Sequence, residues 1–312
     1  MSSDSTATHY VAPIETTTIN VDEVKVGAKP TSLWSDAWRD IRVRPTFWIS
    51  VAIVIVVLLM AFVPTLFTHV DPASCDLTYS NHGPAKGHPL GYTFQGCDIY
   101  SRIVWGTRIS LSVGLLATMI GSFIGLVMGA IAGFYGGWLD SFLSRVGDIF
   151  FSIPYILAAV VVMTVFAEYR NVFTMAFAIG GFAWAATARV VRAEILRVRQ
   201  SDFVTASRAL GKSNFGTLLS HVIPNAIAPL LVVSTLSLAA AIVAEATLTF
   251  LGVGMGNVIS WGTEISNAQT SLRVAPMSLI YPSIFLTVTV LAFIMLGELI
   301  RDALDPRARA QR

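Results

Sequence analysis

One short stretch of the sequence carries the residue types of a phosphate-binding loop. Gly211, Lys212 and Ser213 follow Ala206 after four intervening residues, so alanine stands where such a loop has its first glycine. The loop binds phosphate because a glycine-rich turn after a buried strand directs backbone N–H groups at the ligand. Here the preceding residues, ILRVRQSDFVTASRAL, favour helix rather than strand. We therefore expect this chain to bind no nucleotide itself.

A second group of residues could bind a metal ion. Its members fall within one stretch of the chain: His69, Cys75, His82, His88 and Cys97. Their spacings fit no zinc pattern, and the stretch is rich in Gly and Pro, as surface loops are. The sequence therefore predicts no metal site, and the question left for Cys75 and Cys97 is whether they pair with each other.

Glu245 is the one acidic residue well inside an apolar segment, AAIVAEATLTFLG. A charge at the centre of a bilayer costs about 2.5–3.5 kcal/mol on insertion scales, so such a residue needs a partner inside the protein. Because Glu245 comes late in its segment, we place it near the outer boundary. We expect a structural or gating contact rather than substrate binding.

The composition is that of a membrane protein. Hydrophobic residues make up 54% of the 312 residues, charged residues make up 13%, and the mean hydropathy is +0.67. The net charge of +2 gives no sign of nucleic-acid binding. A membrane-spanning helix needs about 20 apolar residues. Six segments qualify and predict an all-α polytopic fold: residues 47–67, 109–134, 149–167, 172–189, 226–250 and 280–300. Pro154 is expected to kink the third.

Basic residues indicate the orientation of these helices. With both termini in the cytoplasm, all but five of the 21 Lys and Arg residues fall on the inner side, and the five are Lys86, Arg102, Arg108, Arg170 and Arg273. The inner segments are then a flexible tail (1–30) without the apolar core of a signal peptide, an amphipathic helix (31–46), a short connection that carries Arg145, a loop (190–224) and a second tail (301–312). The outer segments are 68–108 and 251–279. Since the outer compartment is oxidising, we expect a Cys75–Cys97 disulfide rather than two free thiols.

The inner loop is predicted to form a helix, a bend and a second helix. Phe203, Ala206 or Ser207, and Leu210 recur at helical spacing, and Gly211 ends this first helix. The second, shorter helix is expected to run to Pro224. Physical chemistry alone also allows a simpler interpretation, in which the loop is a basic connector lying on the anionic inner leaflet.

The segment DFVTASRALGKSNFGTLLSHVIPN resembles the loop by which permeases of ABC importers dock onto their ATPase subunits. The matching positions are Ala206, Gly211, His221, Pro224 and Asn225, whereas Thr205 and Ser207 replace the usual Glu and Ala. The resemblance covers about residues 30–309, through GGWLDSFLSRVGDIFFSIP, RVVRAEILRVRQSDFV, LTFLGVGMGNVISWGTEIS and LIRDALDPR. These resemble the second permease subunit of dipeptide, oligopeptide and nickel importers, although Gly96-Cys97-Asp98 stands where Gly-Arg-Asp is common.

This resemblance implies a non-catalytic subunit with the type I importer permease fold, in a bacterial inner membrane. It implies a coupling helix with the docking residues Asp202, Phe203, Ala206, Ser207, Leu210, Gly211, Lys212, Ser213, His221 and Pro224. The implied partners are a second homologous permease, two ABC ATPase subunits or domains, and an external solute-binding protein. ATP and magnesium would bind to the ATPases, and no cofactor to this chain. The implied cargo is a peptide or a related solute such as a nickel chelate or haem.

Two other classes of function are weighed against this interpretation. A self-sufficient secondary transporter or channel would need an ion site near the midplane, commonly built in inverted repeats. The sequence has no evident repeat between its halves and no central acid apart from Glu245. A membrane-anchored phosphate-loop enzyme comes third, because the loop before Gly211 lacks its strand.

Overall fold

The computed structural model describes residues 33–256 and 258–304, and within these residues the regular structure is helical, with no strand. The predicted tail 1–30 and the last residues of the tail 301–312 lie outside the described residues. The α-helices are α1 (Leu33–Ile41), α2 (Pro45–Phe62), α3 (Ile99–Tyr135), α4 (Gly137–Ser152), α5 (Tyr155–Val165), α6 (Val172–Arg199), α7 (Asp202–Ala209), α8 (Asn214–Thr217), α9 (Ile223–Leu248), α10 (Trp261–Ala268) and α11 (Met277–Leu304). Short 3-10 turns are η1 (Pro64–Leu66), η2 (Leu77–Tyr79), η3 (Ala167–Tyr169) and η6 (Gln269–Ser271), and π-helical turns are η4 (Leu218–Val222) and η5 (Thr249–Val253).

Five helices in the described residues are long and apolar enough to cross a membrane: α2, α3, α6, α11 and the continuous run Asn214–Val253. α4 and α5 are long and apolar enough to cross a membrane only when they are taken together, and they make an angle of 80° at the short break between them. If this bent pair is counted as one span, the described residues contain six. The prediction of six apolar spans in an all-α fold is confirmed in this form. The prediction of one kinked helix over 149–167 is wrong. Pro154 lacks an N–H and holds Ile153 in an extended conformation, so the helix stops rather than bends.

Two helices extend well beyond the segments predicted to span the membrane. α3 has 37 residues, or about 56 Å at 1.5 Å per residue, and begins at Ile99 instead of residue 109. Its start is fixed by the Asp98 side chain, which accepts a hydrogen bond from the Ser101 backbone N–H at 2.7 Å. α6 continues past residue 189 to Arg199. Both helices therefore exceed the ~30 Å hydrocarbon thickness.

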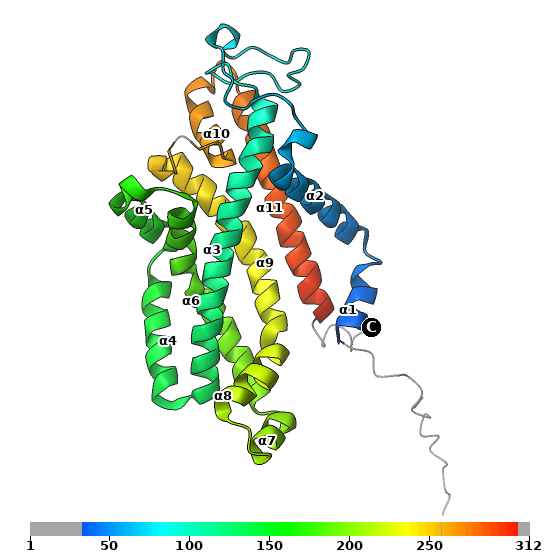
Figure 1. Cartoon of the computed structure of the whole chain (residues 1–312), viewed down its shortest axis with the longest axis vertical. Coiled ribbons are helices and arrows are strands. Elements are labelled where there is room, and N and C mark those ends of the chain that lie inside the picture. Colours follow the sequence, from blue (N-terminus) through cyan, green and yellow to red (C-terminus); the bar gives the residue numbers. More distant parts are fainter. Residues whose placement is uncertain (1–32, 257, 305–312) are drawn as a thin grey trace, which may run out of the picture.

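Close packing of α3 against α6 forms the centre of the molecule. Four glycines recur at every fourth position of α3 on the side that meets α6: Gly121, Gly125, Gly129 and Gly133. A Cβ on Gly129 would lie 2.6 Å from the carbonyl oxygen of Ala188, so only glycine permits this approach of the two backbones. Small residues at such positions drive helix association in membranes. α9 packs beside this pair, and α2 and α11 complete the bundle (Figure 1).

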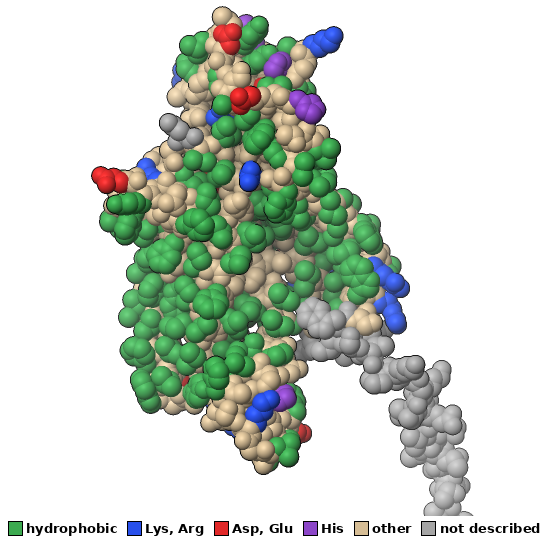
Figure 2. Space-filling view, viewed as in Figure 1, with side chains coloured by type: hydrophobic (Ala, Val, Ile, Leu, Met, Phe, Trp, Pro, Cys, Tyr) green, Lys and Arg blue, Asp and Glu red, His purple; other side chains and the backbone are tan. Residues whose placement is uncertain are grey.

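The two ends of the bundle differ in structure. The loop between η1 and α3 and the helix α10 lie at one end, and α7 and α8 lie at the other (Figure 1). On the face drawn in Figure 2, hydrophobic side chains cover the middle, and most of the charged and His side chains lie towards the two ends. This distribution is that of a protein with an apolar belt in the bilayer and polar ends in water. Arg44 joins α1 and α2 to Asp302 of α11 by an ion pair of 3.2 Å.

Candidate functional site

The predicted docking segment forms a helix, a tight turn and a helix at one end of the molecule (Figure 1). α7 ends at Ala209, and Gly211 then adopts a φ of +83°, which lies in the left-handed region that favours glycine. Ser213 begins the next helix, because its hydroxyl accepts a hydrogen bond from the Gly216 backbone N–H at 3.1 Å. The bend therefore lies at the position predicted from the sequence.

One side of α7 is exposed and the other is buried. Phe203 is 45% exposed, Leu210 is 88% exposed, and Asp202 and Ala206 are also exposed. Ser207 faces the other way: it is buried, and its hydroxyl lies 3.2 Å from the Thr217 hydroxyl. The prediction that Ser207 belongs to the docking surface is therefore wrong, since its side chain braces α7 against α8.

Contacts with α3 hold this segment in place. The guanidinium of Arg208 lies 4.9 Å from the centroid of the Phe134 ring, near the end of α3. Arg199, just before α7, donates hydrogen bonds through Nη1 to the carbonyl oxygens of Gly133 at 3.0 Å and Phe134 at 3.1 Å. The segment therefore meets the end of a helix that runs the full length of the molecule.

The residues whose types match a phosphate-binding loop are not arranged as one in the structure. Gly211, Lys212 and Ser213 follow a helix, and the described residues contain no strand that could precede such a loop. The exposed Lys212 ammonium lies 3.4 Å from His221 Nε2, and the Ser213 hydroxyl is engaged in capping α8.

Pro224 does not end the second helix as predicted. The chain passes from α8 through η4, which contains His221, directly into α9, and Pro224 lies in the first turn of α9. Pro224 has no N–H to donate, and it lies where the π-helical turn η4, with its wider hydrogen-bond pattern, passes into α9. Asn225 adds a hydrogen bond from its side-chain amide to the His221 carbonyl oxygen at 2.6 Å.

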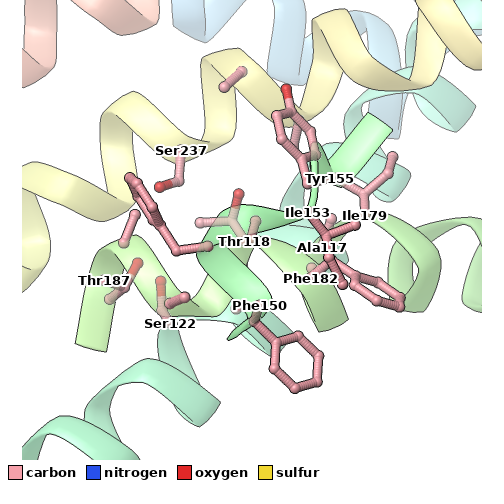
Figure 3. A pocket seen from close by; sticks show the side chains of 18 of the residues that line it. Ala117, Thr118, Ser122, Phe150, Ile153, Tyr155, Ile179, Phe182, Thr187 and Ser237 are labelled. Carbon is pink, nitrogen blue, oxygen red and sulfur yellow. The ribbon is translucent and has the colours of Figure 1, made fainter. Parts of the chain in front are cut away.

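A cavity of about 380 Å³ lies between α3, α6, α9 and the break that separates α4 from α5 (Figure 3). Its lining is mainly apolar, with hydroxyl groups from Thr118, Ser122, Thr187 and Ser237 and the phenol of Tyr155. None of the described residues that line it is acidic or basic. A site of this composition suits an uncharged polar group or a peptide backbone better than an ion. Sequence reasoning did not single out this cavity, although the Pro154 break borders it.

Glu245 lies outside this cavity, in a buried polar cluster that joins three elements. Its carboxylate accepts hydrogen bonds from Ser110 of α3 at 2.9 Å, from Ser260 at 2.8 Å and from Thr249 at 3.2 Å. Ser260 caps α10, and the Trp261 backbone N–H donates to the Ser110 hydroxyl at 3.2 Å. Glu245 is fully buried, so it acts as an internal joint between α3, α9 and α10.

The end of the bundle opposite α7 contains a second buried joint. Arg102 of α3 and Glu264 of α10 form an ion pair of 2.7 Å, and both side chains are largely shielded from solvent. Arg102 also donates to the Pro72 carbonyl oxygen at 3.0 Å. Sequence reasoning missed this pair, because 162 positions separate its members and only the fold brings them together.

Cys75 and Cys97 form a disulfide in the loop at this same end. The three histidines nearby do not converge on a common centre, and the described residues contain no group of three or more side chains suited to hold a metal ion. His88 instead lies 3.0 Å from Asp98, the residue that caps α3.

Comparison with known proteins identifies the family. Residues 121–310 match the family described as binding-protein-dependent transport system inner membrane component, which is more than half of the chain. Residues 32–84 match the N-terminal TM domain of oligopeptide transport permease C. The chain belongs to the binding-protein-dependent inner membrane components. The resemblance seen in the sequence is thereby confirmed, and this family comprises polytopic membrane permeases.

Two curated relatives match this inner membrane component over most of its length. The oligopeptide transport system permease protein OppC of Bacillus subtilis (strain 168) is 34% identical over 289 residues, which is 92% of this chain and 94% of the relative. The glutathione transport system permease protein GsiD of Escherichia coli O6:K15:H31 is 33% identical over 278 residues, which is 88% of this chain and 91% of the relative. The chain is therefore an ABC importer permease subunit along nearly its whole length.

A solved structure shows the same fold. The MetNI methionine ABC transporter, in an inward-facing form, aligns with this inner membrane component at a TM-score of 0.51 and 20% identity, covering 64% of this chain and 95% of the other. The predicted importer permease fold is thereby confirmed.

Proposed function

We propose that this permease subunit couples to cytoplasmic ATPase subunits through residues 202–213. The observation that carries this proposal is the exposed side of α7, where Phe203 and Leu210 present apolar surface next to the Gly211 turn. Apolar side chains on a short exposed helix suit burial in a cleft of a partner protein. The two arginines that join this segment to the end of α3 support a role in transmitting motion.

The mechanism is conformational, and this chain supplies no catalytic residue. Closure of two ATPase subunits around ATP and magnesium would draw two coupling helices together, one from each permease. The path would thereby change from inward-open to outward-open. We expect the second permease to be a different chain of the same fold, because five or six helices do not enclose a path for a sizeable peptide alone. The cavity beside α3, α6 and α9 is this chain's contribution to the path.

We infer that α7 lies in the cytoplasm and the disulfide on the outside of a bacterial inner membrane. Disulfides persist in oxidising compartments, and the Cys75–Cys97 bond lies at the end opposite α7. The distribution of Lys and Arg in the sequence independently supports the same orientation. Both termini are then cytoplasmic.

Peptides are the cargo class that we propose. The two curated relatives carry the names of oligopeptide and glutathione transporters, and glutathione is itself a peptide. A cavity lined by hydroxyl and apolar groups without charged side chains could accept the common backbone of different peptides. We expect the external binding protein to select among dipeptides, longer peptides and related solutes such as nickel chelates or haem.

Uptake into proteoliposomes that contain the purified transporter complex tests this proposal. We expect a labelled oligopeptide to accumulate only with ATP and the binding protein. We expect unlabelled peptides to compete for uptake more strongly than a nickel chelate or haem. Accumulation driven by an ion gradient without ATP would instead support a self-sufficient secondary transporter.

A further inference from the structure

Residues 73–97, here called the outer loop, are held in a fixed shape although they contain little regular structure. The Cys75–Cys97 disulfide closes the loop, and the Asp76 backbone N–H donates to the Gly96 carbonyl oxygen at 3.2 Å. The rings of Tyr79 and Tyr92 stack with their centroids 5.1 Å apart. The Thr78 backbone N–H and hydroxyl hold the pKa of the Asp76 carboxyl below its usual range. The disulfide, the hydrogen bonds and the stacked rings together leave the loop few alternative conformations.

The outer loop is also attached directly to α3. The Ile99 backbone N–H at the start of α3 donates to the Gly91 carbonyl oxygen at 3.1 Å. His88 pairs with Asp98, the residue that caps α3. Just before the loop, Val70 accepts a hydrogen bond from the Ser101 hydroxyl of α3 at 2.6 Å. A force on the outer loop therefore acts on the end of α3.

Three apolar side chains of this loop are exposed: Leu77 (72%), Phe94 (51%) and Tyr79 (47%). They lie on two neighbouring segments, because the Ser80 hydroxyl donates to the Phe94 carbonyl oxygen at 2.6 Å. Exposed apolar residues elsewhere on the bundle can face lipid. These three lie beyond the membrane-spanning helices, beside the exposed charged residue Asp76, which disfavours entry into hydrocarbon. Clustered apolar side chains in water mark protein-interaction sites.

We propose that Leu77, Tyr79 and Phe94 form the surface on which the external solute-binding protein docks. We assign this surface to the binding protein because the family is binding-protein-dependent and because the outer loop lies at the end of the molecule opposite α7. This inference rests on the proposed function. The surface is apolar and preformed, so docking requires little ordering of the loop. Docking would act on α3, whose other end contacts Arg208 of α7 through Phe134.

The test uses the complete transporter reconstituted with the binding protein that co-purifies with it. ATP hydrolysis is measured as a function of binding-protein concentration and expressed relative to the rate of the same preparation without it. For the double variant L77S/F94S we expect the half-maximal concentration to rise about tenfold, as the loss of a buried apolar anchor does at interfaces. The conservative variant Phe94→Leu, which keeps apolar area, should stay within about threefold of the unaltered protein.

Lys86→Ala is the matched control, because Lys86 is an exposed residue of the same loop outside the three-residue surface. We expect it to change the half-maximal concentration by less than about twofold, as most residues away from a hot spot do. An equal loss from Lys86→Ala and L77S/F94S would show that any change in the loop suffices, and would overturn the assignment. Resistance of Cys75 and Cys97 to alkylation in each variant checks that the loop keeps its disulfide.

Two further outcomes separate this inference from the proposed function. If L77S/F94S leaves the half-maximal concentration unchanged, the docking surface is wrong and the importer function stands. If that variant loses the second permease on purification, the three side chains contact the other permease, and the inference is equally wrong. If the unaltered complex shows no stimulation by a binding protein at all, the proposed function itself fails.

Discussion

At the scale of single residues, Glu245 shows how a buried acid can be accommodated without a basic partner. Three hydroxyl groups donate to its carboxylate, and they come from α3, from η5 and from the start of α10. Removing the carboxylate would leave several buried donors without an acceptor, and unsatisfied buried groups are costly. The acid therefore stabilises the joint between these elements.

We expect Glu245→Ala to lower the free energy of unfolding by roughly 2–4 kcal/mol, since it creates a cavity and leaves the hydroxyls unpaired. Glu245→Gln keeps the shape and one acceptor oxygen and should cost about 1–2 kcal/mol. Thermal unfolding of the purified protein in detergent measures both. Glu168→Ala, at an exposed acid of η3, is the control and should have no measurable effect. Equal losses for Gln and Ala at position 245 would contradict this account.

The sequence predicted part of this residue-scale structure. The need for a partner to Glu245 followed from its apolar surroundings, and the pairing of Cys75 with Cys97 followed from their expected compartment. The hydroxyl partners and the Arg102–Glu264 pair did not follow, because they join positions that are remote in the chain. Ser207 was misplaced because helical spacing alone does not say which side of α7 faces the protein.

At the scale of elements, the approach of α3 and α6 depends on four glycines at every fourth position. The spacing is visible in the sequence, but the sequence alone does not say which helix these glycines meet. We expect Gly129→Ala to destabilise the protein by about 1–3 kcal/mol, because the added Cβ would lie 2.6 Å from the Ala188 carbonyl oxygen. Melting temperature in detergent measures the effect.

Gly181→Ala is the matched control on α6. A Cβ at Gly181 would meet its nearest neighbour, the Phe177 ring, at an ordinary 3.6 Å. This variant should be neutral, or more stable by up to about 1 kcal/mol, because alanine favours helix over glycine. If Gly129→Ala and Gly181→Ala change the melting temperature alike, close backbone contact is not what glycine provides at 129.

The turn between α7 and α8 gives a prediction about coupling. A Cβ at Gly211 would meet no atom within 4 Å, so only the left-handed backbone conformation constrains this position. Valine is strained there by about 1–3 kcal/mol, whereas asparagine tolerates the conformation. We expect Gly211→Val in the reconstituted complex to raise the ATP hydrolysed per peptide taken up, and Gly211→Asn to stay close to the unaltered protein. A fall in melting temperature with an unchanged ratio would instead show that Gly211 is only a helix cap.

Apolar periodicity and length predicted the existence of the membrane helices but not their limits. α3 begins ten residues earlier than expected. Asp98 caps it there, outside the apolar stretch from which its start was predicted. Pro154 was expected to kink a helix and instead ends it, since the chain turns by 80° between α4 and α5. Composition does not distinguish a kinked span from two helices, because both bury the same apolar residues.

At the scale of the whole molecule, α3 connects the two ends that we assign to different partners. Its first residues hold the disulfide-closed outer loop, and its last residues contact Arg199 and Arg208 beside α7. A subunit built in this way is suited to the role proposed above, transmitting motion between partners, which is why its partners are the most direct test.

We propose that this chain is a non-catalytic permease subunit that docks onto an ATPase through residues 202–213, which include Gly211, Lys212 and Ser213. The most direct measurement is to purify the tagged chain from its own membranes in mild detergent, identify the proteins that accompany it, and assay ATP hydrolysis with and without them. We expect a second permease, ATPase polypeptides and a binding protein to co-purify, and the chain alone to hydrolyse no ATP. An intact chain that comes out alone and transports without ATP, or that hydrolyses ATP by itself, would contradict the account.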